Sequence, residues 1–214
     1  LVNDYNGNLQ LQMFKRILYI VKHFISNCVP HLPEIVELIE QFIEDNDVQE
    51  TVFALLITLL EQYLDEMETY LGRLVPMLIS LLSENEDTPY ERLWFIRTKV
   101  FQCFTYMSEK LSQFLGFIVP EMITLLNTSM IMTKNTKELD LRNNTTNSND
   151  DIKTTSTSTM SNVNSSNNNN MNNVMDNPEE MLRKEDMEIF AFINKIIPLR
   201  NFYEYMPKIV HALM

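Results

Sequence analysis

Glycine is scarce in this chain of 214 residues, which contains only Gly7, Gly72 and Gly116. Neither the glycine-rich loop of dinucleotide-binding enzymes nor the phosphate-binding loop of P-loop proteins can be built from three glycines so far apart. The alternation of polar and apolar residues that is typical of β-strands is also nearly absent. The sequence therefore excludes these nucleotide-binding motifs and favours an all-α protein.

Cysteine and basic residues are also few. The two cysteines, Cys28 and Cys103, lie among apolar residues, so we expect buried free thiols and a reducing compartment. The formal net charge is −12, from 29 acidic and 17 basic residues. Nucleic acids and anionic membranes both attract basic surfaces, so neither is the expected main partner.

Long apolar runs are missing as well. No stretch reaches the 18 or so apolar residues of a membrane-spanning helix, and the first residues show no basic-then-apolar signal pattern. The chain does not begin with Met, and its last residues, Ile209–Met214, continue an apolar helical pattern. We therefore expect a cytoplasmic protein of which this chain is a piece.

A seven-residue phrase occurs twice, 44 residues apart. Tyr70-Leu71-Gly72-Arg73-Leu74-Val75-Pro76 is followed by Phe114-Leu115-Gly116-Phe117-Ile118-Val119-Pro120. Looser copies end at Pro33, 43 residues before Pro76, and at Pro207. A period of about 40 to 47 residues with two helices per period is typical of HEAT and armadillo repeats. The predicted architecture is an α-solenoid of about four repeats.

Helical periodicity is present in eight segments, which we pair into four antiparallel hairpins. Their apolar faces include Leu55, Leu56 and Leu59 in the third segment, and Leu9, Met13, Ile17, Ile20, Val21 and Phe24 in the first. The segments are Leu9–Ile25, Glu34–Ile43, Val48–Leu64, Arg73–Leu82, Tyr90–Leu111, Phe117–Leu126, Pro178–Ile197 and Tyr203–Met214.

A proline, accompanied in two pairs by a glycine, occurs near the start of the second helix of each pair. Each has a proline that we place in its first turn, where the missing N–H costs little. These prolines are Pro33, Pro76, Pro120 and Pro207. Gly72 and Gly116 come four residues before two of them, and we place both glycines in the turn between paired helices.

A polar insertion interrupts the pattern. Of the 35 residues from 143 to 177, 13 are Asn and 12 are Ser or Thr. Such a segment cannot bury enough apolar surface to offset its ordering entropy, so we expect disorder. The predicted organisation is therefore HEAT repeats over residues 1–127, a low-complexity insertion over 128–177, and a further, truncated repeat over 178–214.

Candidate chemistry is sparse. His23, His31 and His211 are far apart, and none has a second metal ligand at the usual spacing. Cys28 lies three residues from His31, which invites a metal or nucleophile hypothesis, but no third ligand follows. We expect no catalytic residue, no cofactor and no metal site in this segment.

Two other features have both a structural and a functional interpretation. Glu34, Glu37 and Glu40 form an acidic stripe. It is either the solvent-exposed face of a helix or a docking face for a basic partner. A second acidic cluster comprises Asp65, Glu66 and Glu68. Trp94, the only tryptophan, either packs against a neighbouring repeat or serves as an exposed anchor for a partner.

The order of these segments resembles the HEAT-repeat region of the target-of-rapamycin (TOR) protein kinase. The resemblance covers residues 9–127 and 178–214 and is carried by hydrophobic positions in four stretches. These are Ile20–Ile25 with Leu32–Phe42, Tyr70–Pro76, Phe114–Leu126 and Phe202–Val210. The Asn-rich insertion departs from the family, which has a short link there.

The resemblance implies a non-catalytic scaffold within a large serine/threonine kinase of the phosphatidylinositol-3-kinase-related class. The kinase domain of that family lies far downstream, and no part of it is present here. Implied partners are Raptor-type or Rictor-type subunits and a second copy of the chain, with the vacuolar or endolysosomal surface reached through partners. The alternative is a free-standing HEAT adaptor, such as a karyopherin-like transport factor or a phosphatase scaffold.

Overall fold

The computed structural model describes residues 2–83, 89–128, 178–212 and 214. Within these ranges the chain forms helices and turns and no strand, so the all-α prediction is confirmed. The predicted insertion lies outside the described residues from residue 129 onward.

Each of the eight predicted segments contains a helix in the described part of the chain. The longer helices are α1 (Val2–His23), α3 (Leu32–Phe42), α4 (Gln49–Gln62), α6 (Leu71–Ser80), α7 (Tyr90–Tyr106), a helix over residues 115–128, α9 (Pro178–Ile196) and α10 (Met206–Ala212). Short turns join the members of each pair: α2 (Ile25–Cys28) with η1 (Val29–His31), α5 (Leu64–Met67) with η2 (Glu68–Tyr70), η3 (Ser108–Lys110) and η4 (Arg200–Glu204).

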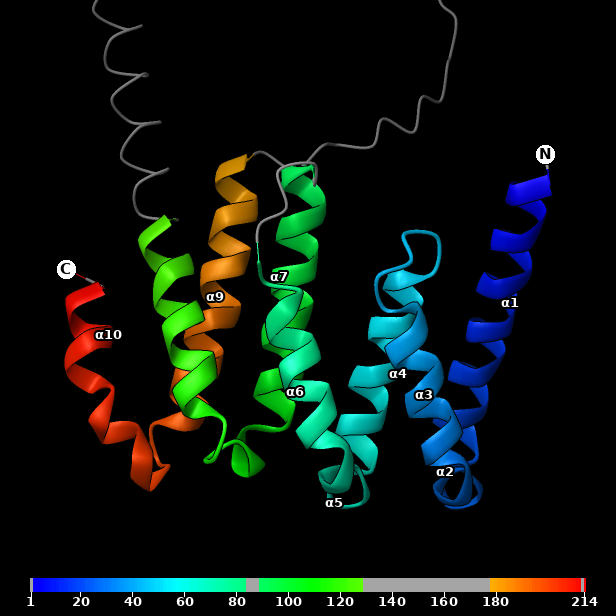
Figure 1. Cartoon of the computed structure of the whole chain (residues 1–214), viewed down its shortest axis with the longest axis horizontal. Coiled ribbons are helices and arrows are strands. Elements are labelled where there is room, and N and C mark those ends of the chain that lie inside the picture. The colour runs from blue at the N-terminus through cyan, green and yellow to red at the C-terminus, as the bar shows by residue number, and fades with distance from the viewer. Residues whose placement is uncertain (1, 84–88, 129–177, 213) are drawn as a thin grey trace, which may run out of the picture.

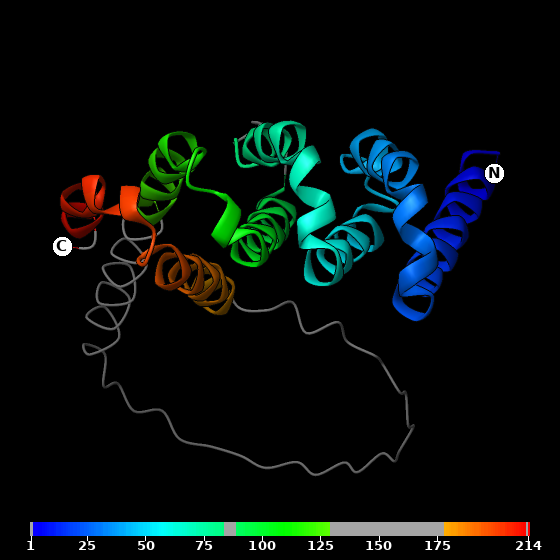
Figure 2. The same ribbon diagram turned by 90° about the horizontal axis from the view of Figure 1, so that it is seen from below.

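The helices stand side by side in an elongated array of two layers (Figures 1 and 2). One layer contains α1, α4, α7 and α9, and its members contact one another in that order. The other contains α3, α6, the helix over 115–128 and α10. The short turns all lie along one edge of the array (Figure 1). One hydrophobic core runs between the layers from Phe14 to Ile209.

Three of the second-layer helices bury the same four positions. The first residue, the fourth, the fifth and the eighth are buried in α3, α6 and the helix over 115–128. They are Leu32, Ile35, Val36 and Ile39; Leu71, Leu74, Val75 and Leu78; and Leu115, Ile118, Val119 and Met122. The first residues of successive second-layer helices are therefore 71 − 32 = 39 residues and 115 − 71 = 44 residues apart. The second agrees with the spacing of the sequence phrase, whereas the first is four residues shorter than the distance between Pro33 and Pro76.

The predicted positions of two prolines and two glycines are wrong. Pro33 is the second residue of α3, as predicted, but Pro76 lies inside α6. Pro120 has the same internal position in the helix over 115–128. Gly72 and Gly116 are each the second residue of their helix, and neither has a positive φ.

The spacing of glycine and proline nevertheless has a physical explanation. A proline ring inside a helix crowds the carbonyl group four residues earlier. That carbonyl belongs to Gly72 for Pro76 and to Gly116 for Pro120. A glycine lets the backbone shift there at lower cost, because it has no side chain to restrict its dihedral angles. The repeated seven-residue sequence therefore places a proline in the helix interior, four residues after a glycine.

The predicted buried face of α1 is wrong in part. Val21, a member of the predicted face, is fully buried, and so is Phe14, which was not predicted. Four other members of that face, Leu9, Met13, Ile20 and Phe24, are 65%, 38%, 48% and 53% exposed. Apolar residues occur on two sides of this helix, so periodicity cannot decide which side packs on the array. The side with Phe14 packs inward, and its ring meets that of Phe42 edge-on at a centroid distance of 5.4 Å.

The two helical glycines should respond differently to alanine. A Cβ atom at Gly72 would have no neighbour within 4 Å, whereas one at Gly116 would lie 3.3 Å from the Tyr205 hydroxyl oxygen. We expect Gly72→Ala to raise the free energy of unfolding by up to about 0.5–1 kcal/mol, because the entropy advantage of a helical alanine outweighs the lost backbone freedom beside Pro76. Gly116→Ala should lack this gain, because Tyr205 must move. Urea unfolding of both variants checks this, and equal gains would contradict the contact between Gly116 and Tyr205.

Candidate functional site

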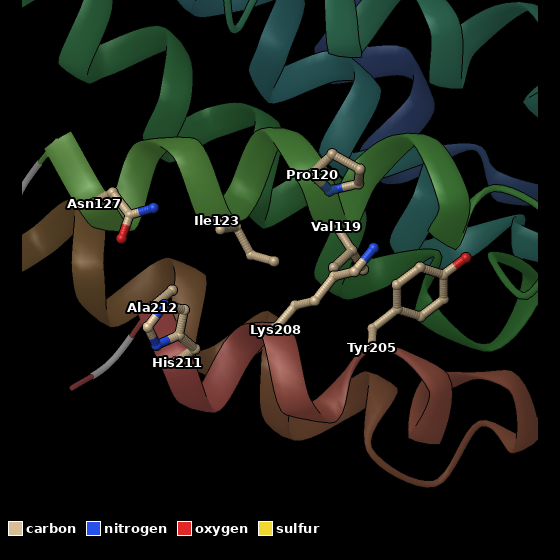
Figure 3. Close-up of a pocket in the computed structure, with 8 residues that line it drawn as sticks. All are labelled: Val119, Pro120, Ile123, Asn127, Tyr205, Lys208, His211 and Ala212. Atoms are coloured by element: carbon tan, nitrogen blue, oxygen red, sulfur yellow. The ribbon is translucent and has the colours of Figure 1, made fainter.

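A groove lies between the helix over 115–128 and α10, at the C-terminal end of the array (Figure 3). It encloses about 430 Å³ and is lined by Val119, Pro120, Ile123, Asn127, Tyr205, Lys208, His211 and Ala212. Its floor is mostly apolar. In Figure 3 the Lys208 side chain extends from α10 toward Val119, and Tyr205 stands beside it. At the other end, Asn127 lies on the wall formed by the helix over 115–128 and His211 on the wall formed by α10.

The segment before α10 fixes these side chains. Phe202, in η4, is fully buried and anchors the turn to the core. The Tyr205 N–H donates to the Phe202 carbonyl at 2.9 Å, and the Lys208 and Ile209 N–H groups donate to the Tyr205 carbonyl at 3.1 Å. Ile209 is 2% exposed, so α10 is held by one buried side. Residues 205, 208, 211 and 212 follow helical spacing and therefore share the groove-facing side.

The α7–α9 contact joins the parts of the chain before and after the insertion through a polar seam. Arg97 Nη1 lies 3.8 Å from Glu185 Oε1, and these side chains are 4% and 3% exposed. Farther along, Gln102 Nε2 donates to Glu188 Oε1 at 2.9 Å. The Lys184 ammonium lies 5.8 Å from the centre of the Trp94 ring. Trp94 therefore packs against a neighbouring helix, which is the structural interpretation of this residue.

The acidic stripe is only partly free for binding. Glu34 and Glu37 are exposed on α3, but Glu40 Oε1 lies 3.3 Å from Arg73 Nε on the next pair. In the second cluster, Lys110 Nζ binds Asp65 at 3.1 Å and Glu68 at 2.7 Å. The hydrogen bonds that the Lys110 ammonium donates, first to Glu68 and then to Asp65, raise the pKa of Lys110. Both clusters therefore help to hold adjacent pairs together.

The predicted burial of both cysteines is confirmed. The Cys28 thiol donates to the Phe24 carbonyl at 3.3 Å, and His31 is exposed. Cys103 is fully buried, and this burial raises the pKa of its thiol. Burial, followed by the neighbouring Cys28, raises the pKa of Tyr63 to about 12. The described residues include no group of three possible metal ligands.

The groove was not predicted from the sequence, although His211 was considered as an isolated residue. Lys208 and Asn127 are ordinary surface residues in sequence, and 81 positions separate them (208 − 127). The sequence feature that could have indicated the groove is the final segment, in which Lys208 and His211 lie three residues apart beside apolar positions. That signal identifies one wall of the groove but not the wall across from it.

In the portion of the chain that the structure describes, no helix is both long enough and apolar enough to cross a bilayer. Comparisons with protein-family models, curated proteins and solved structures found no match to this chain.

Proposed function

We propose that this chain is a non-catalytic scaffold segment of a TOR-like serine/threonine kinase, built from HEAT-type helix pairs that present docking surfaces to other proteins. The observation that carries the proposal is the recurrence of one buried register in α3, α6 and the helix over 115–128. A helix pair with this register cannot bury its apolar face alone and is stabilised by its neighbours. Stacking such pairs produces an extended protein-binding surface.

The TOR-like assignment is supported by the order of the segments that resemble that family. Leu32–Phe42, Tyr70–Pro76 and Phe114–Leu126 each lie at the turn and second helix of successive pairs. The partners implied are Raptor-type or Rictor-type subunits and a second copy of the chain. A cytoplasmic location follows from the same assignment, with the vacuolar or endolysosomal surface reached through partners.

Reading the coding sequence beyond Met214 tests this function. We expect an open frame that continues through further helix pairs into a kinase domain with its catalytic and metal-binding acidic residues. A stop codon shortly after Met214, following one polar capping helix, would overturn the kinase assignment. The chain would then be a free-standing adaptor, for which the exposed Glu34 and Glu37 are the first docking residues to examine.

A further inference from the structure

The groove beside α10 differs in charge from the rest of the chain. The chain has 29 acidic and 17 basic residues, yet none of the eight residues that line this groove is acidic. Lys208 and His211 supply its basic character, and both are exposed. Of the acidic residues nearby in sequence, Glu121 and Glu204 are described, and neither lines the groove.

Apolar and hydrogen-bonding groups have separate places in the groove. Pro120, Ile123 and Ala212 form an apolar floor, while the lining residue Val119 is fully buried. Asn127 and the Tyr205 hydroxyl provide hydrogen-bonding groups on either side of it (Figure 3). The volume of about 430 Å³ lies near the lower end of the range of ligand clefts, roughly 300–1,000 Å³. It accommodates anchoring side chains of a partner rather than a whole domain.

From this arrangement we propose that the groove binds an acidic amphipathic helix of a partner protein. Apolar side chains of that helix occupy the floor at Pro120, Ile123 and Ala212, and a flanking carboxylate pairs with Lys208 and His211. The two walls are helices that lie side by side (Figure 3), which suits the binding of a third helix by its apolar face. This inference rests on the proposed protein-docking function but not on the kinase assignment.

Two fluorescein-labelled 14-residue helical peptides provide the probes. Both have leucine at positions 4, 7, 8 and 11, and the residues flanking this stripe are glutamate in one peptide and lysine in the other. Fluorescence anisotropy with the full chain should show binding of the glutamate peptide and little binding of the lysine peptide. Lys208→Glu should weaken binding of the glutamate peptide at least tenfold. The double variant Lys208→Glu/His211→Glu should bind the lysine peptide instead.

Lys195→Glu is the matched control, because Lys195 is an exposed lysine of α9 that does not line the groove. Its affinity for the glutamate peptide should equal that of the unchanged chain. Equal loss in both lysine variants would reveal unspecific charge attraction and overturn the proposal, as would unaltered binding by Lys208→Glu. Circular dichroism confirms that each variant is folded.

A second copy of the chain is the competing occupant. Sedimentation of the chain without peptide should show no association that depends on Lys208. A dimer that dissociates in the Lys208→Glu variant would assign the groove to self-association and overturn the peptide proposal. A failure of peptide binding would leave the kinase assignment standing, because that assignment is tested by the downstream coding sequence.

Discussion

Leu56→Asp should unfold the chain or leave it without a cooperative unfolding transition. Leu56 is fully buried in α4, and α4 contacts both α1 and α7 in the first layer. A carboxylate at this position would be removed from water, and its burial costs several kcal/mol. Small domains have a total stability of only about 5–15 kcal/mol. Circular dichroism and urea unfolding provide the measurement.

Leu9→Asp makes the same chemical change at a residue that is 65% exposed. Its effect on the free energy of unfolding should be within about 0.5 kcal/mol, as for other surface substitutions. Leu56→Ala provides an intermediate step, with an expected loss of about 2–5 kcal/mol from the cavity it leaves. A folded Leu56→Asp variant with unchanged stability would show that the register of α4 is wrong.

The second large effect is expected at the Arg97–Glu185 pair. Arg97→Met removes the cation 3.8 Å from a carboxylate that is only 3% exposed. Loss of one partner of a buried pair costs about 3–5 kcal/mol, because the remaining charge stays away from water. Since Glu185 belongs to α9, the variant should loosen α9 from α7, and urea unfolding should show a lower midpoint.

The double variant Arg97→Met/Glu185→Leu tests the cause. Replacing both charges with apolar side chains also removes the buried carboxylate, so it should recover most of the lost stability. Lys99→Met serves as a control on the same helix, since Lys99 is only half-buried and contacts Gln102. If the double variant were less stable than Arg97→Met, the loss would come from packing of the arginine stem rather than from charge.

The sequence predicted the helices better than their packing. All eight helical segments were found because each has a strong 3.6-residue period. The period failed in α1, where apolar residues on two sides, such as Phe14 and Ile20, left the buried side undecided. Periodicity also gave the wrong position for Pro76 within its helix. We placed Pro76 in the first turn, because a proline in a helix interior normally ends the helix. Only the structure shows that α6 continues through it.

Local sequence patterns could not predict the groove or the buried Arg97–Glu185 pair. Arg97 and Glu185 are 88 positions apart (185 − 97), and each is an ordinary surface residue by composition. Their burial follows from the docking of α9 on α7 across the insertion. The same holds for Asn127 and Lys208. Contacts between distant segments require knowledge of the pairing, which one sequence without alignment does not contain.

The docking of α9 on α7 also has a consequence for folding kinetics. The first three helix pairs form through contacts between neighbours in sequence, whereas α9 must return to α7 after residues 107–177. Contacts that close longer loops cost more entropy and form more slowly. We therefore expect α9 and α10 to join the array last. Because α10 forms one wall of the groove, a ligand of the groove would bind only to chains that have completed folding.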